Sequence, residues 1–208
     1  MGFEGKSGKY LEDVVLQFTG FPGIGRKTAL RFALHLLRRS DTEVELFLEA
    51  VRKLKTQTKF CRICHNLSDD DICPICSDSK RNSSIICVVE GIHDVIAIES
   101  TSQYNGLYHV LGGLISPIDG IGPHDIKIKS LIERLENNKV DEVIFALPAT
   151  TEGDTTNYYI GKKISGLCNE ITIISRGVAV GEELQYTDGI TLGQSIINRK
   201  PFFEIMKK

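Results

Sequence analysis

The chain has 208 residues, of which 41% are apolar and 25% are charged, and its formal net charge is −2. This is the composition of an ordinary globular protein, and it excludes a disordered or fibrous chain. No apolar run reaches the length of a membrane span, and the first ten residues lack the apolar core of a secretion signal. We therefore expect a cytoplasmic protein without membrane contact.

The small net charge hides an uneven distribution along the chain. The first 60 residues carry 11 Lys and Arg against seven Asp and Glu, whereas the other 148 carry 14 against 20. A basic segment attached to an acidic body favours a polyanionic partner for that segment. Charges scattered over a solvated surface would give the same counts, so the positions of the basic residues must decide.

Three helices are predicted near the N-terminus. Apolar residues recur at helical spacing over residues 11–18, 29–37 and 44–54. Between the first two helices the sequence TGFPGIG holds three glycines and a proline, which together cannot lie inside a helix. Residues 40–42, Ser-Asp-Thr, supply the capping chemistry with which the third helix can begin.

The turn between the first two helices is the candidate nucleic-acid site. Gly23 and Gly25 let the backbone approach a ligand closely, and the free N–H groups at the start of the next helix suit a phosphate. Lys27 and Arg31 follow on one helix face, and Arg26 adds to the positive field. A tight turn with solvated basic residues is the alternative. The coincidence of turn, helix start and basic face favours sequence-independent contacts with nucleic-acid phosphates.

Four of the six cysteines form two CxxC pairs in one short segment. Cys61 with Cys64, and Cys73 with Cys76, can place four thiolates around a tetrahedral Zn²⁺ ion. Because sulfur fills all four positions, we expect one structural zinc ion per chain. A redox dithiol pair and an iron–sulfur centre with four cysteine ligands are the alternatives. Zinc is favoured, because neither CxxC pair lies between the strand and helix that surround the redox pair of a thioredoxin.

From residue 84 the pattern changes to alternating strands and helices. Strands are predicted at 84–90, 107–111, 141–147 and 170–175, with helices between them at 94–101, 128–138 and 155–165. This order predicts a Rossmann-like parallel sheet with helices on both faces. The tail after residue 175 holds one short predicted helix, around residues 191–199. Cys87 and Cys168, in apolar strand and helix contexts, are expected to be core residues.

Carboxylates follow two of the predicted strands. Glu90 ends the first strand and Asp94 lies near the start of the next helix, while Glu152 and Asp154 follow the strand at 141–147. Ligand sites of α/β proteins gather at the carboxyl ends of parallel strands, where such groups could hold Mg²⁺. Carboxylates that cap helices are the alternative. No nucleophile in a recognisable catalytic setting and no Walker A loop accompany them, so ATP hydrolysis is not expected.

The order of these motifs resembles one family. The chain carries in succession GFPGIGRKTALRFALHLL, the four cysteines, VVEGIHDVIAIE, HVLGGLISPIDGIGP, EGD and GVAVGEELQYTDGITLGQSI. Over nearly the whole chain this resembles the RecR family of bacterial recombination mediators. The resemblance implies a multi-domain α/β protein: a helix-hairpin-helix DNA-binding domain (residues 1–58), a four-cysteine zinc finger (59–82), a Toprim domain (83–175) and a C-terminal oligomerisation segment (176–208).

The same resemblance implies a function and roles for particular residues. The protein would be no enzyme but a DNA-binding mediator that acts with RecO, and in some settings RecF, to help RecA displace single-strand-binding protein at gaps. It would assemble into a ring, usually a tetramer, that can encircle DNA. The basic hairpin positions correspond to Lys27 and Arg31, the zinc ligands to the four cysteines, and the Toprim acidic positions to Glu90, Asp94, Glu152 and Asp154.

The chain departs from the family pattern around those acidic positions. Gly91-Ile92-His93 replaces the usual acidic residue, Pro and Lys after the first glutamate, Pro148-Ala149 replaces the usual Asn-Pro, and Asp154 replaces a glutamate. The carboxylates are kept while their surroundings change. A Mg²⁺-dependent Toprim nuclease is the alternative function. A scaffold that binds only proteins is a third, against which the glycine hairpin and the uneven charge both count.

Overall fold

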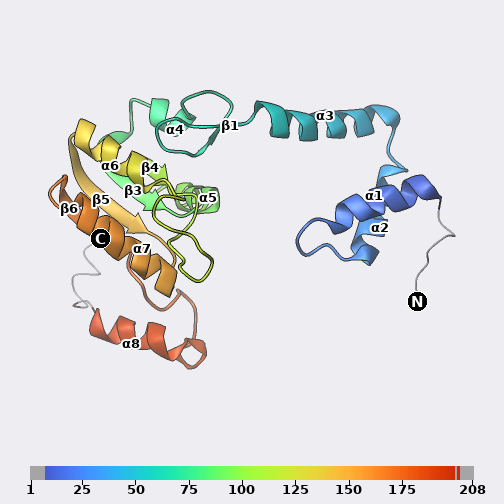
Figure 1. The fold of residues 1–208 in the computed structure, drawn as a ribbon. Coiled ribbons are helices and arrows are strands. Elements are labelled where there is room, and N and C mark those ends of the chain that lie inside the picture. The colour runs from blue at the N-terminus through green and yellow to red at the C-terminus, as the bar shows by residue number, and fades with distance from the viewer. Residues whose placement is uncertain (1–7, 200, 202–208) are drawn as a thin grey trace. The chain divides into compact units, whose positions relative to one another are not determined.

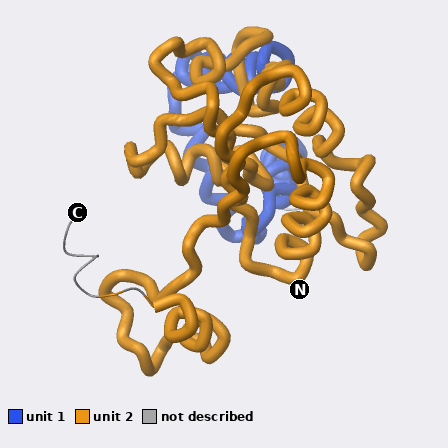
Figure 2. Tube along the Cα trace, turned by 90° about the vertical axis from the view of Figure 1, so that its left-hand side faces the viewer, with its two compact units in different colours: residues 1–58 blue, residues 59–208 orange. Residues whose placement is uncertain are grey.

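The structure of the chain, a computed structural model, describes residues 8–199 and 201. The chain divides into two compact units, residues 1–58 and residues 59–208 (Figure 2). Each unit has buried apolar clusters of its own, and each is described by itself. Among the described residues, no helix is long and apolar enough to cross a bilayer.

The first unit consists of three helices, as the apolar spacing predicts. Its elements are α1 (Lys9–Thr19), α2 (Arg26–Leu36) and α3 (Asp41–Gln57) (Figure 1). Helices α1 and α2 pack against each other around Val15, Ala29 and Ala33, which are buried. The small alanines let the two helix backbones approach closely, and the Phe18 ring packs edge-on against Phe32.

Much of the apolar surface of this unit faces solvent. Helix α3 buries none of its residues, and Leu46 and Leu54 are 61% and 66% exposed. The apolar face of α2 is covered only in part, because Phe32 remains 43% exposed and Leu37, which follows the helix, remains 73% exposed. Helix α3 alone exposes five large apolar side chains, and apolar surface gathered on one element is typical of surfaces that another molecule covers.

The second unit begins with a small four-cysteine module, residues 59–78, which we call the metal module because the sequence predicts a metal site there. Two antiparallel strands, β1 (Lys59–Phe60) and β2 (Leu67–Ser68), and one helical turn, α4 (Pro74–Ser77), carry the two CxxC pairs. The sequence predicts no regular elements here, because strands of two residues and a helix of four leave no periodic pattern. Cys61, Cys64 and Cys73 form the buried centre of the module.

A parallel four-stranded sheet follows in the same unit, as the alternating pattern predicts. Its strands lie in the order β4-β3-β5-β6. At the carboxyl ends of the three neighbouring strands, Val89 lies opposite both Val110 and Ala146. This register brings the residues that follow those strands to one edge of the sheet. The strands are β3 (Asn82–Val89), β4 (Gly106–Val110), β5 (Val140–Ala146) and β6 (Cys168–Ile173).

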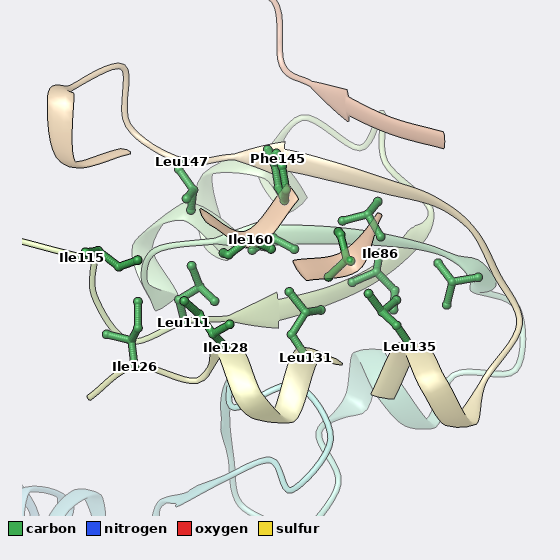
Figure 3. Close-up of a cluster of buried hydrophobic side chains, with 14 residues drawn as sticks. Ile86, Leu111, Ile115, Ile126, Ile128, Leu131, Leu135, Phe145, Leu147 and Ile160 are labelled. Atoms are coloured by element: carbon green, nitrogen blue, oxygen red, sulfur yellow. The ribbon is translucent and has the colours of Figure 1, made fainter. Parts of the chain in front are cut away.

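Helices cover both faces of this sheet. Ile86 and Val88 point toward α6 (Ile128–Asn137) and α7 (Thr151–Ile164), in the cluster that Figure 3 shows. Cys87 and Val89 alternate with them and point toward α5 (Ile92–Ser100) on the other face. This period-two alternation explains why β3 is apolar at every position from Ile85 to Val89, since both of its faces are buried.

Two predicted elements of the sheet region differ from the structure. Helix α7 begins at Thr151, four residues before the prediction, because the Thr150 hydroxyl accepts a hydrogen bond from the Gly153 N–H at 3.1 Å and caps the helix there. A Cβ at Gly153 would lie 2.0 Å from the carbonyl oxygen of Pro148, so this tight entry requires glycine. Cys168 opens strand β6 and does not lie in a helix; it packs, half-buried, against the main core.

The tail contains the short helix that the sequence predicts. Helix α8 (Gly189–Ile197) begins two residues before the prediction, where the Asp188 carboxylate accepts hydrogen bonds from two N–H groups of the first turn. A 3₁₀ turn, η1 (Leu184–Tyr186), precedes it. The predicted oligomerisation segment extends to residue 208, and its residues 200 and 202–208 lie outside the described part of the chain, as do residues 1–7 of the first predicted domain.

Candidate nucleic-acid, metal and partner sites

The turn between α1 and α2 leaves the start of α2 open. Gly23 has a φ of +76°, a conformation that glycine adopts without strain. Gly25 forms the N-cap of α2 and offers no side chain to the N–H groups of the first turn, which contains no acidic residue. These N–H groups and the positive end of the helix dipole therefore remain available to an anion.

The basic residues of α2 differ in their partners. Lys27 and Arg31 are exposed and, in the described part of the chain, take part in no ion pair. Arg26 instead pairs with Glu12 of α1 at 2.6 Å. Lys27 and Arg31 can therefore contact a polyanion without first breaking an internal bond, whereas Arg26 also joins the two helices of the hairpin.

The four predicted metal ligands come together. The sulfur atoms of Cys61, Cys64, Cys73 and Cys76 all lie within 4.8 Å of one another, and no histidine or carboxylate belongs to the group. The β1–β2 hairpin supplies the first pair, with His65 at a φ of +62° closing its turn. The α4 turn supplies the second. Four converging sulfur ligands without an open position fit a structural Zn²⁺ ion.

The ionisation of the thiols couples metal binding to the release of protons. Burial raises the pKa of Cys73 to about 11. A hydrogen bond with Cys76, together with burial, raises the pKa of Cys64. Burial also opposes ionisation of Cys61, but N–H groups of Cys73 and Cys64 outweigh it and lower the pKa to about 7. Without a cation the cluster therefore retains protons at neutral pH, and metal binding must displace them.

The metal module closes the free edge of the sheet at β4. The Val110 N–H donates to the carbonyl oxygen of Cys64 at 2.8 Å. Two outward-facing carbonyls of the same strand accept from side chains: Tyr108 from Arg134 at 2.7 Å, and Gly106 from Arg81 at 3.4 Å. Each of these groups would otherwise be open to pairing with another strand.

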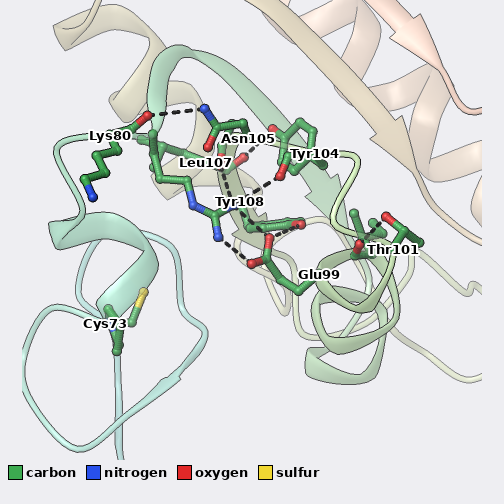
Figure 4. A network of polar contacts seen from close by, with 12 residues as sticks. Cys73, Lys80, Glu99, Thr101, Tyr104, Asn105, Leu107 and Tyr108 are labelled. Carbon is green, nitrogen blue, oxygen red and sulfur yellow. Dashed lines mark hydrogen bonds and ion pairs between the residues drawn. The ribbon is translucent and has the colours of Figure 1, made fainter.

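A polar network connects the end of the metal module to the sheet. Arg81, just before β3, forms an ion pair with Glu99 of α5, and the Tyr108 hydroxyl donates to the same carboxylate at 2.7 Å. Figure 4 shows Glu99 and Tyr108 facing each other, and Asn105 reaching the carbonyl oxygen of Lys80. Hydrogen bonds from Arg81 and Tyr108 hold the pKa of Glu99 below its usual value despite partial burial.

Glu90 and Asp94 lie in one pocket at the carboxyl ends of β3 and β4. The pocket has a volume of about 660 Å³, and Phe60 and His65 of the metal module and Lys127 also line it. Burial, and then the charge of Asp94, raises the pKa of Glu90. Asp94 also accepts the Gly91 N–H at 2.8 Å and so caps α5, as the capping alternative proposed.

The other two predicted acidic residues lie elsewhere. Glu152 and Asp154 belong to the first turn of α7 and do not line the pocket of Glu90. Asp154 forms a two-pronged ion pair with Arg176 at 2.5 and 3.2 Å, which lowers its pKa. Among the described residues, the cysteines form the one group of three or more side chains close enough to hold a metal. The predicted Mg²⁺ site is therefore not supported.

Four family models match successive parts of the chain. The models of the RecR helix-hairpin-helix, the RecR four-cysteine zinc finger domain, the Toprim domain and the RecR C-terminal region match residues 11–54, 58–78, 84–175 and 177–200. Recombination protein RecR of Phocaeicola vulgatus is 55% identical over 192 residues, 92% of this chain and 94% of the relative. Its namesake in Porphyromonas gingivalis W83 is 51% identical over 201 residues, 97% of each.

The chain belongs to the RecR family. Membership implies a role in recombinational repair, and the relatives are named recombination proteins, not enzymes. The Toprim domain of this RecR-family chain does not by itself establish catalysis. The resemblance deduced from the order of motifs is thereby confirmed, as are the mixed α/β fold and the four-cysteine site.

Sequence reasoning missed two groups of residues in this RecR-family chain. Phe60 and Lys127 line the Glu90 pocket, and Arg176 pairs with Asp154. None of them belongs to a motif with fixed spacing, and the last pair is separated by 22 residues. Only the fold brings these residues together.

Proposed function

We propose that this RecR-family chain is a DNA-binding mediator of recombinational repair, active in the cytoplasm and without catalysis of its own. The observation that carries the proposal is the α1–α2 hairpin. It combines a helix start without a side-chain cap and, on one exposed face, the cations Lys27 and Arg31, which form no ion pair among the described residues. N–H groups and cations contact phosphates without reading bases, which suits a factor that acts at gaps of any sequence.

We also propose that the chain acts as a homo-oligomeric ring, usually a tetramer, around DNA. The exposed apolar side chains of α3 and α8 support assembly, since Leu54 and Ile190 are 66% and 81% exposed. In a ring, several hairpins would engage one DNA molecule, so weak individual contacts would combine into firm binding.

The partners proposed are RecO and, in some settings, RecF, with which the ring would help RecA displace single-strand-binding protein. The Glu90 pocket supports a protein partner at the sheet edge. It combines partly desolvated carboxylates with the apolar surface of Phe60, which is 66% exposed, and of Ile92. A basic side chain with a long apolar stem, such as Lys or Arg, fits both features.

The hairpin assignment is tested by DNA binding across a range of salt concentrations. Replacing Lys27→Ala together with Arg31→Ala removes two phosphate contacts. We expect weaker binding to a gapped duplex and a plot of log K against log salt whose slope falls by about 1–2, since each lost contact contributes about 0.7–0.9. Fluorescence anisotropy at several salt concentrations measures both quantities.

A matched control separates the hairpin from overall charge. Arg52→Ala with Lys55→Ala removes the same charge from exposed positions of α3 in the same unit. We expect a smaller change in slope for this pair. Equal affinity of the wild type and the folded hairpin variant would refute the assignment. Cleavage of DNA or RNA that requires Mg²⁺ and disappears in Glu90→Gln would instead support the nuclease alternative.

A further inference from the structure

Cys76 differs from the other three cysteines of the metal cluster in its exposure. Cys61, Cys64 and Cys73 are at most 1% exposed, whereas Cys76 is only partly buried. Cys76 also lines a pocket of about 640 Å³ between the metal module and helix α6. The pocket gives small solutes a route to one ligand of the cluster, while burial shields the other three.

The surroundings of this pocket are cationic. Arg62, Arg134 and Lys139 line it together with a single carboxylate, Glu133. In the described part of the chain none of these three cations takes part in an ion pair, while Glu133 faces Lys129 at 3.6 Å. Cations that line a pocket attract anionic reagents and so speed the reaction of such reagents with a cysteine there.

A second thiolate lies within reach of Cys76. The four ligand sulfurs lie within 4.8 Å of one another, so three other sulfurs lie within that distance of the Cys76 sulfur. Small rotations of the side chains can therefore bring two sulfurs to bonding distance. The cluster thus provides both an accessible thiolate and a partner with which an oxidised sulfur can condense.

We propose that Cys76 is the site at which peroxides oxidise the metal cluster. Its thiolate sulfur attacks one oxygen of hydrogen peroxide; an S–O bond forms, the O–O bond breaks, and hydroxide leaves. A neighbouring cysteine thiolate then attacks the resulting sulfenic sulfur, an S–S bond forms, and a second hydroxide leaves. Two thiolates have lost two electrons and one peroxide has gained them. The cluster is left with two of its four ligands, which cannot retain the cation.

The inference rests on the cysteine cluster and does not depend on DNA binding. Oxidation would act on the sheet through the contact already described, because the Cys64 carbonyl holds the N–H of Val110 on the edge strand. Loss of the metal module would free the Val110 N–H on that edge and remove Phe60 and His65 from the Glu90 pocket. Oxidation would thus disturb the proposed partner site while leaving the sheet core in place.

The first test uses the intact, zinc-loaded protein. It is exposed to less than one equivalent of hydrogen peroxide, sulfenic acids are trapped with a dimedone-type reagent, and the labelled cysteines are identified by mass spectrometry. We expect Cys76 to carry at least about fivefold more label than Cys61, Cys64 or Cys73. A chromogenic chelator should detect zinc release in proportion to peroxide consumed. Equal labelling of the four cysteines, or first labelling of another, would overturn the proposal.

The second test examines the cations, using zinc-loaded variants with unchanged zinc content. Arg62→Ala with Lys139→Ala removes two positive charges from the pocket, and Lys162→Ala with Lys163→Ala removes two from exposed positions of α7. At Cys76, an anionic aromatic disulfide should react at least about three times more slowly in the pocket variant than in the wild type. Neutral N-ethylmaleimide should react equally fast with both proteins. Unchanged reaction with the anionic reagent would overturn the electrostatic part of the proposal.

Discussion

The two units of the chain bury their apolar residues to very different extents. In the second unit, 14 buried side chains form one continuous cluster (Figure 3). They come from the sheet, from α6 and α7, and from the loops that precede these two helices. In the first unit, the cluster between α1 and α2 contains three buried residues, and α3 buries none. The acidic body therefore buries a large continuous core, whereas the basic helical unit leaves much of its apolar surface exposed.

The two units also differ in what determines their stability. In the body, side chains from several elements converge, so each substitution affects many contacts at once. In the helical unit, the cations and most of the large apolar side chains are exposed, and local interactions such as caps determine how well each helix forms.

The largest effect is expected from a pair of identical substitutions in the two units. Leu131 of α6 is fully buried, and Leu54 of α3 is 66% exposed. Leu131→Ala should lower the free energy of unfolding by about 2–5 kcal/mol, because it leaves a cavity. Leu54→Ala should change it by less than about 0.5 kcal/mol when the chain is monomeric. Urea unfolding measures both.

The effect of Leu54→Ala should also depend on protein concentration. If a second copy covers α3, as the proposed ring requires, Leu54→Ala should become destabilising at protein concentrations where the wild type is oligomeric. A loss of several kcal/mol for Leu54→Ala in the dilute monomer would contradict the comparison, because it would mean that α3 is already buried within its own chain.

A smaller effect is expected at the network that joins the metal module to the body. Glu99→Gln removes the charge that Arg81 and Tyr108 contact, and should cost about 1–2 kcal/mol at pH 7. The folded-state pKa of Glu99 lies below its usual 4.5, so this stabilisation is complete above that pH. It is lost as the pH falls through the lowered pKa. Thermal unfolding of the wild type and of Glu99→Gln from pH 7 to pH 3 should therefore show that their difference in stability shrinks as the pH falls. A difference that grows instead would exclude this stabilising role of the Glu99 carboxylate.

The smallest effect is expected at the start of α3. The Ser40 hydroxyl accepts the N–H of Glu43, and the Glu43 carboxylate accepts the Ser40 N–H at 2.9 Å. Ser40→Ala should destabilise α3 by about 1 kcal/mol. Hydrogen exchange should accelerate for amides of α3 and remain unchanged in α6. Equal acceleration in both helices would show that the two units unfold together.

The sequence predicted the features that depend on regular spacing. The two CxxC pairs have a fixed spacing, and the structure brings Cys61, Cys64, Cys73 and Cys76 together as expected. Helical and alternating apolar patterns predicted the three N-terminal helices and the parallel sheet with helices on both faces. The DNA-binding roles of Lys27 and Arg31 stay predictions, which the salt experiment tests.

The sequence could not predict the features that depend on distant contacts. It grouped Glu152 and Asp154 with Glu90 because all three follow strands, but the Thr150 cap begins α7 early and Arg176 pairs with Asp154. The order of the strands and the pocket shared with Phe60 also have no local signal. Such features arise from packing between segments far apart in the chain, which periodicity does not report.

The closure of the β4 edge by Cys64 and Arg134 has a consequence for the order of folding. An uncovered edge strand invites pairing with other chains, and this hazard is greatest while a protein is being synthesised. The metal module, residues 59–78, leaves the ribosome before β4, so the cover that Cys64 provides is present when that strand emerges. Helix α6, which supplies Arg134, follows β4 by fewer than 30 residues. A shortage of zinc during growth should then appear first as aggregation of nascent chains.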